Sequence, residues 1–459
     1  MESIVDVDYL VVGAGAMGMA FVDALTSAAD VSVALVDRRH APGGHWLDAY
    51  GFVRLHQASA FYGVASTLLG GGRIQTTGPE RGLHERASAA EVCEYYARVL
   101  TQLVGTGKVS FHPRAEYLGE GRFVSLLSGR RFHAPRARLV DARYLSPDIP
   151  ALTPPPFLVE DGAHVVPVNE LVRLAAAPER FVLVGAGKTA IDTAVWLLQS
   201  GVEPDRITWV RPRDPWLLNR AVVQPDPAVF LAMAADTMTA VAAASDPDEA
   251  FLRMEDAGIM LRIDRDVLPT MAKTPTLAQW ELDLVRTIED VVRRGHLRAI
   301  GPGRLRFADG EVRIPAGSLV VHCAAEGLKY PGLVPIWRTE SITPQPVRVG
   351  FPCYGAALAG YVEATRESDE EKNRICRPSP YSDTPADWAR MQVIGGDASL
   401  AMSKEPDLRE WSHRTTLNPA RVPADRADDP AVVAAMARLR EWIGPGRARL
   451  AEFAAELPA

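Results

Sequence analysis

The sequence predicts an α/β fold in which a unit of strand, turn, helix and strand occurs twice. Three observations support this prediction. A short apolar run ends in a glycine turn at residues 9–18 and again at 181–190, an apolar helical segment follows each turn, and each unit closes on a strand with a charged end. This order is that of a βαβ dinucleotide-binding unit, so the predicted fold class is α/β with two Rossmann-like dinucleotide-binding domains.

The first unit has the glycine spacing that a dinucleotide requires. Gly13 allows a tight turn, Gly15 lets the backbone approach a pyrophosphate, and Gly18 lets the helix pack closely on its strand. The free N–H groups at the start of the helix face the phosphates. Asp37 ends the second strand, where a carboxylate accepts hydrogen bonds from both ribose hydroxyls. The cofactor contacts expected here are Gly13, Gly15, Ala16, Met17, Gly18, Asp37 and Arg38.

The second unit repeats the first with the opposite charge at its strand end. Ala190 takes the place of the third glycine, and the strand ends on Arg211, with Arg213 two residues further on. A carboxylate suits a free ribose 2′-hydroxyl and a guanidinium suits a 2′-phosphate, so the first site fits FAD and the second fits NADPH. The alternative is that both arginines are solvated surface charges. The expected contacts are Gly185, Gly187, Lys188, Thr189, Ala190, Arg211 and Arg213.

The segment after the first unit is predicted to lie at a ligand. The paired glycines at 43 and 44 make a sharp turn with a close backbone approach, and Trp46 supplies an aromatic wall. Residues 53–63 are dense in polar and aromatic side chains but have no clean period. Such a stretch is typical either of a loop that lines a pocket or of a surface connection.

The two units are expected to be laid end to end with two additions. Behind each glycine unit come a hairpin and a strand, at 122–140 and at 304–323, and a proline cluster at 150–156 separates the two halves. The predicted domains are 1–150 (FAD-binding, first part), 151–325 (NADPH-binding, with a helical insertion at about 225–296), 326–365 (return to the FAD domain) and 366–459 (C-terminal extension).

Several further elements follow from apolar spacing. Ser88 and Glu91 form a capping box that opens a helix. A helix with an apolar stripe is predicted from about 276 to 294, and a strand at 347–351 is expected before a helix of small residues at 355–364. The extension contains an amphipathic helix at 431–443, and its default role is extra packing or a contact between copies in a homo-oligomer.

Composition restricts the kinds of partner. Fifty Lys and Arg against 57 Asp and Glu give a net charge of −7 without a long basic run, which argues against nucleic acid. The four cysteines have no C-x-x-C spacing, so neither structural zinc nor any other metal site is predicted, and a reducing cytosol suits them. The apolar stretch at 228–244 is expected to be a soluble helix, and the first strand begins too early for a signal peptide. We therefore expect a cytoplasmic protein without a membrane partner.

With these motifs in hand, the chain resembles the two-dinucleotide-binding-domain flavoproteins, and within them most of all the flavin-containing (class B) monooxygenases. The features that carry the resemblance are Gly13–Gly18, Asp37, Gly43–Trp46, Gly185–Ala190 and Arg211–Trp216. The resemblance implies that NADPH passes hydride to FAD and that the reduced flavin reacts with molecular oxygen. The resulting flavin hydroperoxide would oxygenate a small organic substrate.

The resemblance also implies site residues. Gln57 falls where related enzymes carry an asparagine beside the flavin and is the expected catalytic residue, with His56, Ser59 and Tyr62 as neighbours. Gly44, His45 and Trp46 are expected to contact the cofactor, as are His56 and Gln57. The helix at Gly355 would aim its N-terminus at the pyrimidine edge of the flavin.

Two alternatives to monooxygenation stay open. The family motif F-x-G-x-x-x-H is absent, and the region where it belongs reads Asp161-Gly162-Ala163-His164-Val165. One alternative is an NADPH-dependent flavin reductase or dehydrogenase that does not insert oxygen. The other is a non-catalytic flavoprotein that binds nucleotides as a scaffold. A disulfide reductase is disfavoured because no redox cysteine pair is spaced for it.

Overall fold

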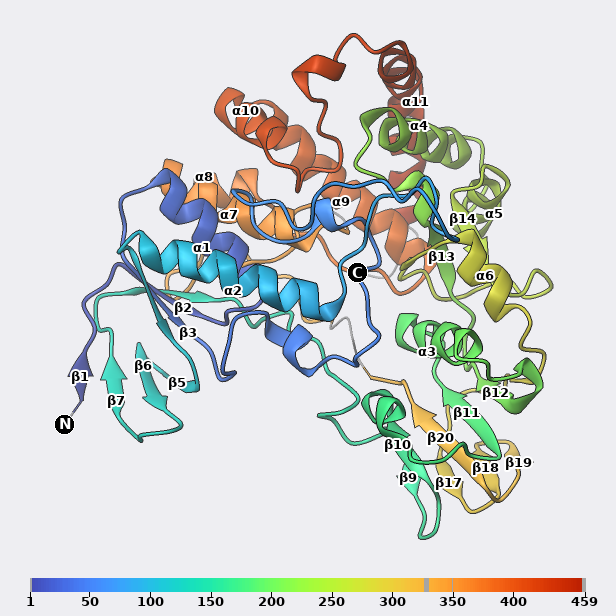
Figure 1. Ribbon diagram of the computed structural model, residues 1–459. Coiled ribbons are helices and arrows are strands. Elements are labelled where there is room, and N and C mark those ends of the chain that lie inside the picture. Colours follow the sequence, from blue (N-terminus) through green and yellow to red (C-terminus); the bar gives the residue numbers. More distant parts are fainter. Residues whose placement is uncertain (1, 326–329, 349, 456–459) are drawn as a thin grey trace.

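Each glycine unit builds one parallel sheet in the computed structural model, which describes residues 2–325, 330–348 and 350–455 (Figure 1). The first sheet has the order β4-β3-β2-β8 and the second the order β10-β20-β11-β12-β16, with every neighbouring pair parallel. The predicted α/β fold class is confirmed. The strands are β2 (Tyr9–Val12), β3 (Val33–Val36), β4 (Val109–His112), β8 (Arg138–Asp141), β10 (Val165–Pro167), β11 (Arg180–Val184), β12 (Ile207–Val210), β16 (Val291–Val292) and β20 (Ser318–His322).

Helices cover these sheets because the central strands are apolar on both faces. All four residues of β3 and of β12 are buried. α1 (Ala16–Ala28) follows the first turn and α3 (Lys188–Gln199) the second, while α2 (Ala89–Gly105) opens with the predicted Ser88 and Glu91 capping box. α7 (Pro352–Thr365) packs along α1, where a Cβ on Gly360 would overlap the Phe21 carbonyl oxygen.

The predicted hairpins are confirmed behind both units. β6 (Arg122–Ser125) pairs with β7 (Arg131–His133), and β18 (Arg304–Phe307) pairs with β19 (Gly310–Arg313), both antiparallel. Each hairpin belongs to a small sheet of its own, in the orders β1-β7-β6-β5 and β19-β18-β17-β9. The remaining strands of these sheets are β1 (Ser3–Ile4), β5 (Ala115–Gly119), β9 (Leu158–Val159) and β17 (Ala299–Gly301).

The single helix predicted over residues 276–294 is wrong. This stretch holds β15 (Thr276–Leu277), α6 (Gln279–Val285) and β16. Val291 and Val292 pair with Trp209 and Val210, so the edge of the second sheet captures two valines that helical spacing alone would assign to a stripe. β13 (Trp216–Asn219) comes before the insertion, and the rest of the insertion is α4 (Pro227–Ala242), α5 (Pro247–Asp256) and β14 (Met260–Arg262).

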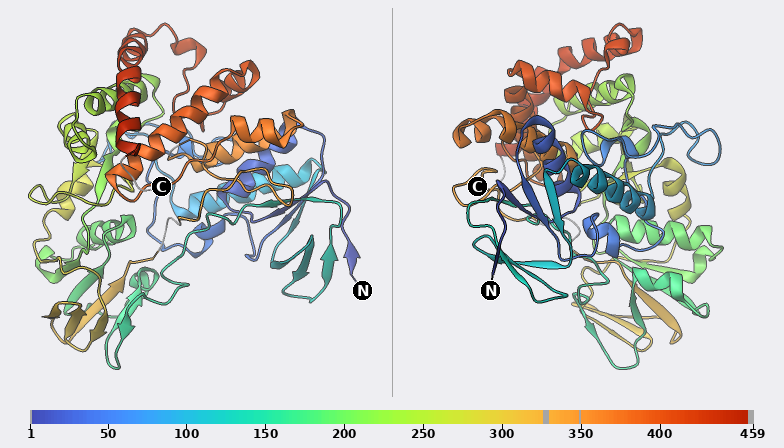
Figure 2. Two further views of the ribbon diagram at one scale, coloured as in Figure 1. Left: turned by 180° about the vertical axis from the view of Figure 1, so that it is seen from behind. Right: turned by 60° about the vertical axis from the view of Figure 1, so that its left-hand side comes forward.

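The C-terminal extension lies beside this insertion, above the second sheet in the view of Figure 1. α11 packs along α4 and against α9, and Figure 2 shows the same grouping from behind. α11 runs beyond the predicted range 431–443. The helices are α8 (Asp369–Ile375), α9 (Pro385–Ser403), α10 (Pro406–Arg414) and α11 (Pro430–Ala455).

Two smaller expectations concern the return segment and the membrane. Residue 349, in the predicted strand 347–351, and residues 326–329, at the start of the predicted return segment, lie outside the described residues. Residues 347–348 and 350–351 belong to no strand. Among the helices that the structure describes, none combines the length and apolar character needed to cross a membrane.

Candidate functional site: a cavity shared by two glycine turns

Both glycine turns open into one cavity of about 1730 Å³. This volume exceeds the 300–1,000 Å³ or so typical of a pocket for one small ligand. The insertion and the C-terminal extension supply its other walls. The predicted residues that line it are Gly13, Gly15, Ala16, Met17, Asp37, Arg38, Gly44, His45, Trp46, His56, Gln57, Gly185, Gly187, Lys188, Thr189 and Arg213.

The first turn has the geometry of a phosphate cradle. Gly13 has φ of 110°, and a Cβ on Gly18 would overlap the Gly13 carbonyl oxygen. Gly15 precedes α1 without a side-chain cap, so the first N–H groups of the helix are open to an anion. Gly44 approaches so closely that a Cβ on it would lie 2.9 Å from the Gly15 Cα. Bare backbone therefore forms this end of the cavity.

Asp37 is held at the edge of this cradle. Its Oδ2 accepts a hydrogen bond from the Ala14 N–H at 2.6 Å, and its Oδ1 accepts one from the Arg39 N–H at 2.7 Å. Only 6% of the residue is exposed, and it lines the cavity. Each carboxylate oxygen keeps a second acceptor site, so Asp37 remains able to accept ribose hydroxyls. Arg38 is mostly exposed, with its Nε 3.9 Å from Glu116.

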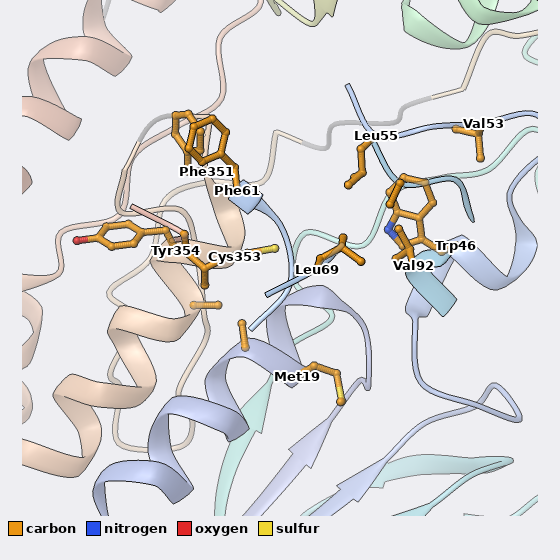
Figure 3. Close-up of a cluster of buried hydrophobic side chains, with 14 of the residues drawn as sticks. Met19, Trp46, Val53, Leu55, Phe61, Leu69, Val92, Phe351, Cys353 and Tyr354 are labelled. Carbon is orange, nitrogen blue, oxygen red and sulfur yellow. The ribbon is translucent and has the colours of Figure 1, made fainter. Parts of the chain in front are cut away.

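His45, Trp46 and Tyr62 form a neutral wall of the cavity. The Trp46 Nε1–H donates to the Tyr62 hydroxyl at 2.6 Å, and the two rings meet edge to face. Burial, helped by the nearby Arg39 cation, lowers the pKa of His45 to about 4, so its ring is uncharged at neutral pH. Figure 3 shows Trp46 beside Leu55 in the buried cluster that backs this wall.

Gln57 and His56 lie between the first unit and the start of α7. The Gln57 Nε2–H donates to the Gly350 carbonyl at 3.1 Å. The His56 carbonyl accepts from the Arg220 Nε–H at 2.9 Å and from the Thr276 hydroxyl. Burial and the surrounding cations hold the pKa of His56 well below its usual range. Ser59 does not join them, because it lines a separate pocket of about 400 Å³.

A buried charge cluster anchors this loop to the insertion. The Arg220 side chain is fully buried and bonds Glu80 at 2.9 Å and Glu281 at 2.5 Å. Glu80 and Glu281 also pair with Arg86. Despite burial, the surrounding cations lower the pKa of Glu281 to about 2. The His56 carbonyl is therefore held by a cation that is itself fixed on two sides.

The second turn repeats the first in its backbone. Gly185 has φ of 130°, and Gly187 precedes α3 without a side-chain cap and with open space where a Cβ would be. Lys188 is buried and forms an ion pair with Asp192, which also accepts the Tyr50 hydroxyl at 2.8 Å. Tyr50 lies in the first unit's half of the chain, so this contact joins the two halves.

Arg211 is expected from the sequence either to contact a 2′-phosphate or to be a solvated surface charge. In the structure it is buried at the end of β12. Its guanidinium lies over the Trp209 ring, 4.9 Å from the centroid, and its Nη1 is 3.2 Å from Asp214. Only 2% of the residue is exposed, and burial lowers its pKa to about 10. Arg211 is thus neither a solvated surface charge nor part of the described cavity lining. Gly18 and Ala190 also lie behind the lining, where they pack their helices.

Arg213 is the arginine of this strand end that faces the cavity. Its Nη1 is 2.6 Å from Asp383, and its Nη2–H donates to the Thr270 carbonyl at 2.6 Å. The Lys273 Nζ lies 3.8 Å from the same Asp383 carboxylate and also lines the cavity. Two cations from distant segments therefore converge on one acid at the second site.

Sequence reasoning missed Lys273 and its neighbour Thr274. Thr274 lines the cavity with φ of 46°, a left-handed conformation that is rare for a β-branched residue. Such backbone outliers gather at binding and active sites. The available signal was the Lys273-Thr274-Pro275 segment directly before the predicted helix from 276, because a proline at this point favours a turn.

The fold and the two turns define a protein with two dinucleotide-binding domains, which confirms the predicted class at the level of the fold. The family model of the NAD(P)-binding Rossmann-like domain matches residues 11–58, which span the first turn, Asp37 and Gln57.

Three mycobacterial proteins are similar to this chain over most of its length. The chain is 40% identical over 418 residues to Uncharacterized protein Rv2000 of Mycobacterium tuberculosis (strain H37Rv) and to Uncharacterized protein Mb2023 of Mycobacterium bovis. The alignment covers 90% of this chain and 78% of each relative. At this identity and coverage, the chain belongs to the same protein family as these relatives.

Weaker similarity extends to solved structures. A flavin-containing monooxygenase from Stenotrophomonas maltophilia aligns with a TM-score of 0.42 and 16% identity, covering 80% of this chain and 98% of that one. A cyclohexanone monooxygenase from Rhodococcus sp. Phi1 bound to NADP+ aligns with a TM-score of 0.47 and 13% identity, covering 97% and 98%.

Proposed function

We propose that the protein is an FAD-dependent oxidoreductase that takes electrons from NADPH and inserts oxygen into a small organic substrate. The observation that carries this proposal is the single cavity into which both glycine turns open. Two dinucleotides held at these turns would share one cavity, as hydride transfer between them requires.

The residues at each turn suit different nucleotides. At the first turn, the uncapped start of α1 suits a pyrophosphate, and Asp37 suits a ribose with a free 2′-hydroxyl. At the second, the uncapped start of α3 lies in the same cavity as Arg213 and Lys273, whose cations suit a 2′-phosphate. This supports FAD at the first turn and NADPH at the second.

FAD, when bound, supplies hydride acceptance and reactivity toward oxygen, and the chain supplies position and dryness. Trp46 and Phe351 are buried rings that line the cavity together with Gln57, and Phe61 packs against Phe351, so these rings would provide the dry part of the site. The Gln57 amide, fixed by the Gly350 carbonyl, offers a hydrogen-bond donor at this point. The rings of His45 and His56 are uncharged at neutral pH, so neither adds a cation at this end of the cavity.

The test is an anaerobic titration of the purified holoenzyme with NADPH and with NADH, followed by admission of air. We expect NADPH to bleach the flavin at much lower concentration than NADH does. With a substrate present, little hydrogen peroxide should form for each NADPH oxidised. Stoichiometric peroxide with every compound tried would favour the flavin reductase instead. Absence of bleaching would favour the non-catalytic flavoprotein, and a colourless chain that takes up no FAD would reject the proposal.

Replacing Arg213 with alanine tests the nucleotide assignment. Loss of one charge-assisted contact to the 2′-phosphate should lower the NADPH preference over NADH by roughly 10-fold or more. Arg447→Ala is the matched control, because Arg447 also lines the cavity and also pairs with an acid at 2.6 Å, but it belongs to α11 and not to the end of the second strand. An equal loss for both nucleotides in Arg213→Ala would remove the phosphate role.

A further inference from the structure

The part of the cavity away from the glycine turns is an apolar chamber. Its walls come from α4, α9 and α11, three helices that lie together in Figures 1 and 2. Phe230 and Met233 of α4, Met391 of α9 and Ile443 of α11 face this space. A chamber of this kind accepts a bulky apolar molecule. The methionines adapt to irregular shapes, so they do not specify one outline.

Arg348 is a cation at the edge of this chamber without a carboxylate partner. It lines the cavity, and its Nη1–H donates to the Asn418 side-chain oxygen at 3.0 Å. Among the residues that the structure describes, no Asp or Glu forms an ion pair with it. Arg213 and Arg447 line the same cavity and are both paired, with Asp383 and Asp397 respectively. Burial lowers the pKa of Arg348, as expected for a guanidinium withdrawn from water.

An arginine in this state is suited to a ligand anion. The guanidinium has five N–H donors, and the protein satisfies one of them with a neutral amide. Arg348 is half-buried, so its cation is partly withdrawn from water, and a carboxylate that binds it in two-pronged fashion offsets that cost. The Asn418 contact ties the side chain to the C-terminal extension, whose helices α9 and α11 contribute walls of the chamber.

The surroundings of Arg348 link the chamber to the proposed reaction site. The Gly350 carbonyl, two residues further on, accepts the Gln57 amide. The centroid of the Phe351 ring is 5.3 Å from that of Phe61 and 6.1 Å from that of Phe230 of α4. Figure 3 shows Phe61 and Phe351 side by side. An anion bound at Arg348 would therefore lie beside an aromatic patch that leads both to Gln57 and to the chamber.

We propose that the substrate of this enzyme is an apolar molecule that carries a carboxylate, and that Arg348 binds this carboxylate. That the bound acid is a substrate rests on the proposed function. The preference of the chamber for an acid over an alcohol can be measured without catalysis. Arg348 is then the residue that determines specificity for an organic acid, while the chamber accepts the apolar body.

The experiment compares two probes of equal chain length, decanoate and decan-1-ol, by isothermal titration calorimetry on the full-length holoenzyme. The wild type should bind decanoate at least about 10-fold more tightly than the alcohol, the value of one strong charged contact. Arg348→Gln should bind both probes equally, and Arg348→Lys should keep part of the preference. Arg447→Gln, which removes a paired cation from the same cavity, should leave the preference unchanged.

The other anion that could face Arg348 is the reduced flavin, and the flavin midpoint potential distinguishes it. A lower potential in Arg348→Gln with an intact acid preference would assign Arg348 to the flavin and overturn the proposal. A wild type that binds the alcohol as tightly as the acid would also overturn it. If Arg348→Gln does not fold, Arg348→Lys decides the question, because full retention of the preference would exclude a two-pronged contact. Acid preference without bleaching by NADPH would reject the proposed function alone.

Discussion

The two glycine turns share a backbone but differ in what their strand ends offer a ligand. Gly13 and Gly185 have φ of 110° and 130°, and Gly15 and Gly187 both precede a helix in extended conformation. Asp37 stands at the cavity, whereas Arg211 is buried behind it. The comparison teaches that turn geometry follows from local sequence, while the exposure of the charged residue depends on its tertiary neighbours.

Asp37 and Arg211 differ in their access to the cavity because they have different hydrogen-bond and ion-pair partners. Asp37 is held by N–H groups of its own turn and of Arg39, which leave its free acceptor sites toward the cavity. Arg211 instead meets Trp209 and Asp214, and Asp214 is shared with Arg293 at 2.8 Å. The Trp209 ring and the Asp214 carboxylate offset part of the desolvation cost of this cation, and its pKa stays lowered to about 10. Arg213, which lines the cavity, is the residue to which we assign the phosphate in the proposed function.

The largest expected effect concerns how closely α1 and α3 pack against the turns that precede them. Gly18→Ala should destabilise the protein by at least about 3 kcal/mol and remove bound FAD, because its Cβ would overlap the Gly13 carbonyl oxygen. Ala190→Gly, at the matching place in the second unit, should cost only about 1 kcal/mol. Urea unfolding and flavin content check both variants. Equal effects would show that the two helix starts are packed alike.

Arg211 and Arg213 are expected to differ in their effects on stability and on nucleotide preference. Arg211→Ala should lower the free energy of unfolding by about 2 kcal/mol, because Asp214 loses one of two buried partners. Its preference for NADPH over NADH should stay near that of the wild type. Denaturant melts and nucleotide titrations measure the two quantities. Loss of the nucleotide preference without loss of stability would return the phosphate role to Arg211.

A smaller effect depends on pH and on the first unit alone. The pKa of His45 is lowered to about 4 from its usual 6.5, so the unfolded chain takes up a proton first as the pH falls. The free energy of unfolding has its full value from His45 above pH 6.5 and decreases as the pH falls from 6.5 toward 4. Between pH 7 and 5.5 the loss should be about 1 kcal/mol. His45→Gln should make this part of the profile less steep, while His56, whose pKa is also lowered, keeps part of the slope.

The smallest expected effect concerns the contact between the two halves. Tyr50→Phe removes the hydroxyl that Asp192 accepts, and should cost roughly 0.5 kcal/mol, because Lys188 still neutralises Asp192. Urea titration of the variant measures this loss. Asp192→Asn should cost more, since it leaves Lys188 buried without its counter-ion. The idea fails if Tyr50→Phe is the more damaging of the two changes.

Local sequence predicted the parts of this protein that depend on a few neighbouring residues. The glycine spacing, the Ser88 and Glu91 capping box and both hairpins could be predicted because backbone conformation and short-range hydrogen bonds decide them. The stretch 276–294 could not, because its valines form a strand only when the edge of β12 is beside them.

The sequence by itself determined that two dinucleotide-type turns exist, since a positive φ and a close helix approach demand glycine wherever the chain lies. Only the tertiary structure decided which charges reach the shared cavity. It buried Arg211, brought Lys273 to Arg213, and placed Arg348 at the chamber with no ion pair to any acid in the described part of the chain. The physical reason is that a side chain's ion partners come from residues far away in sequence, and these partners set its burial and its availability to a ligand.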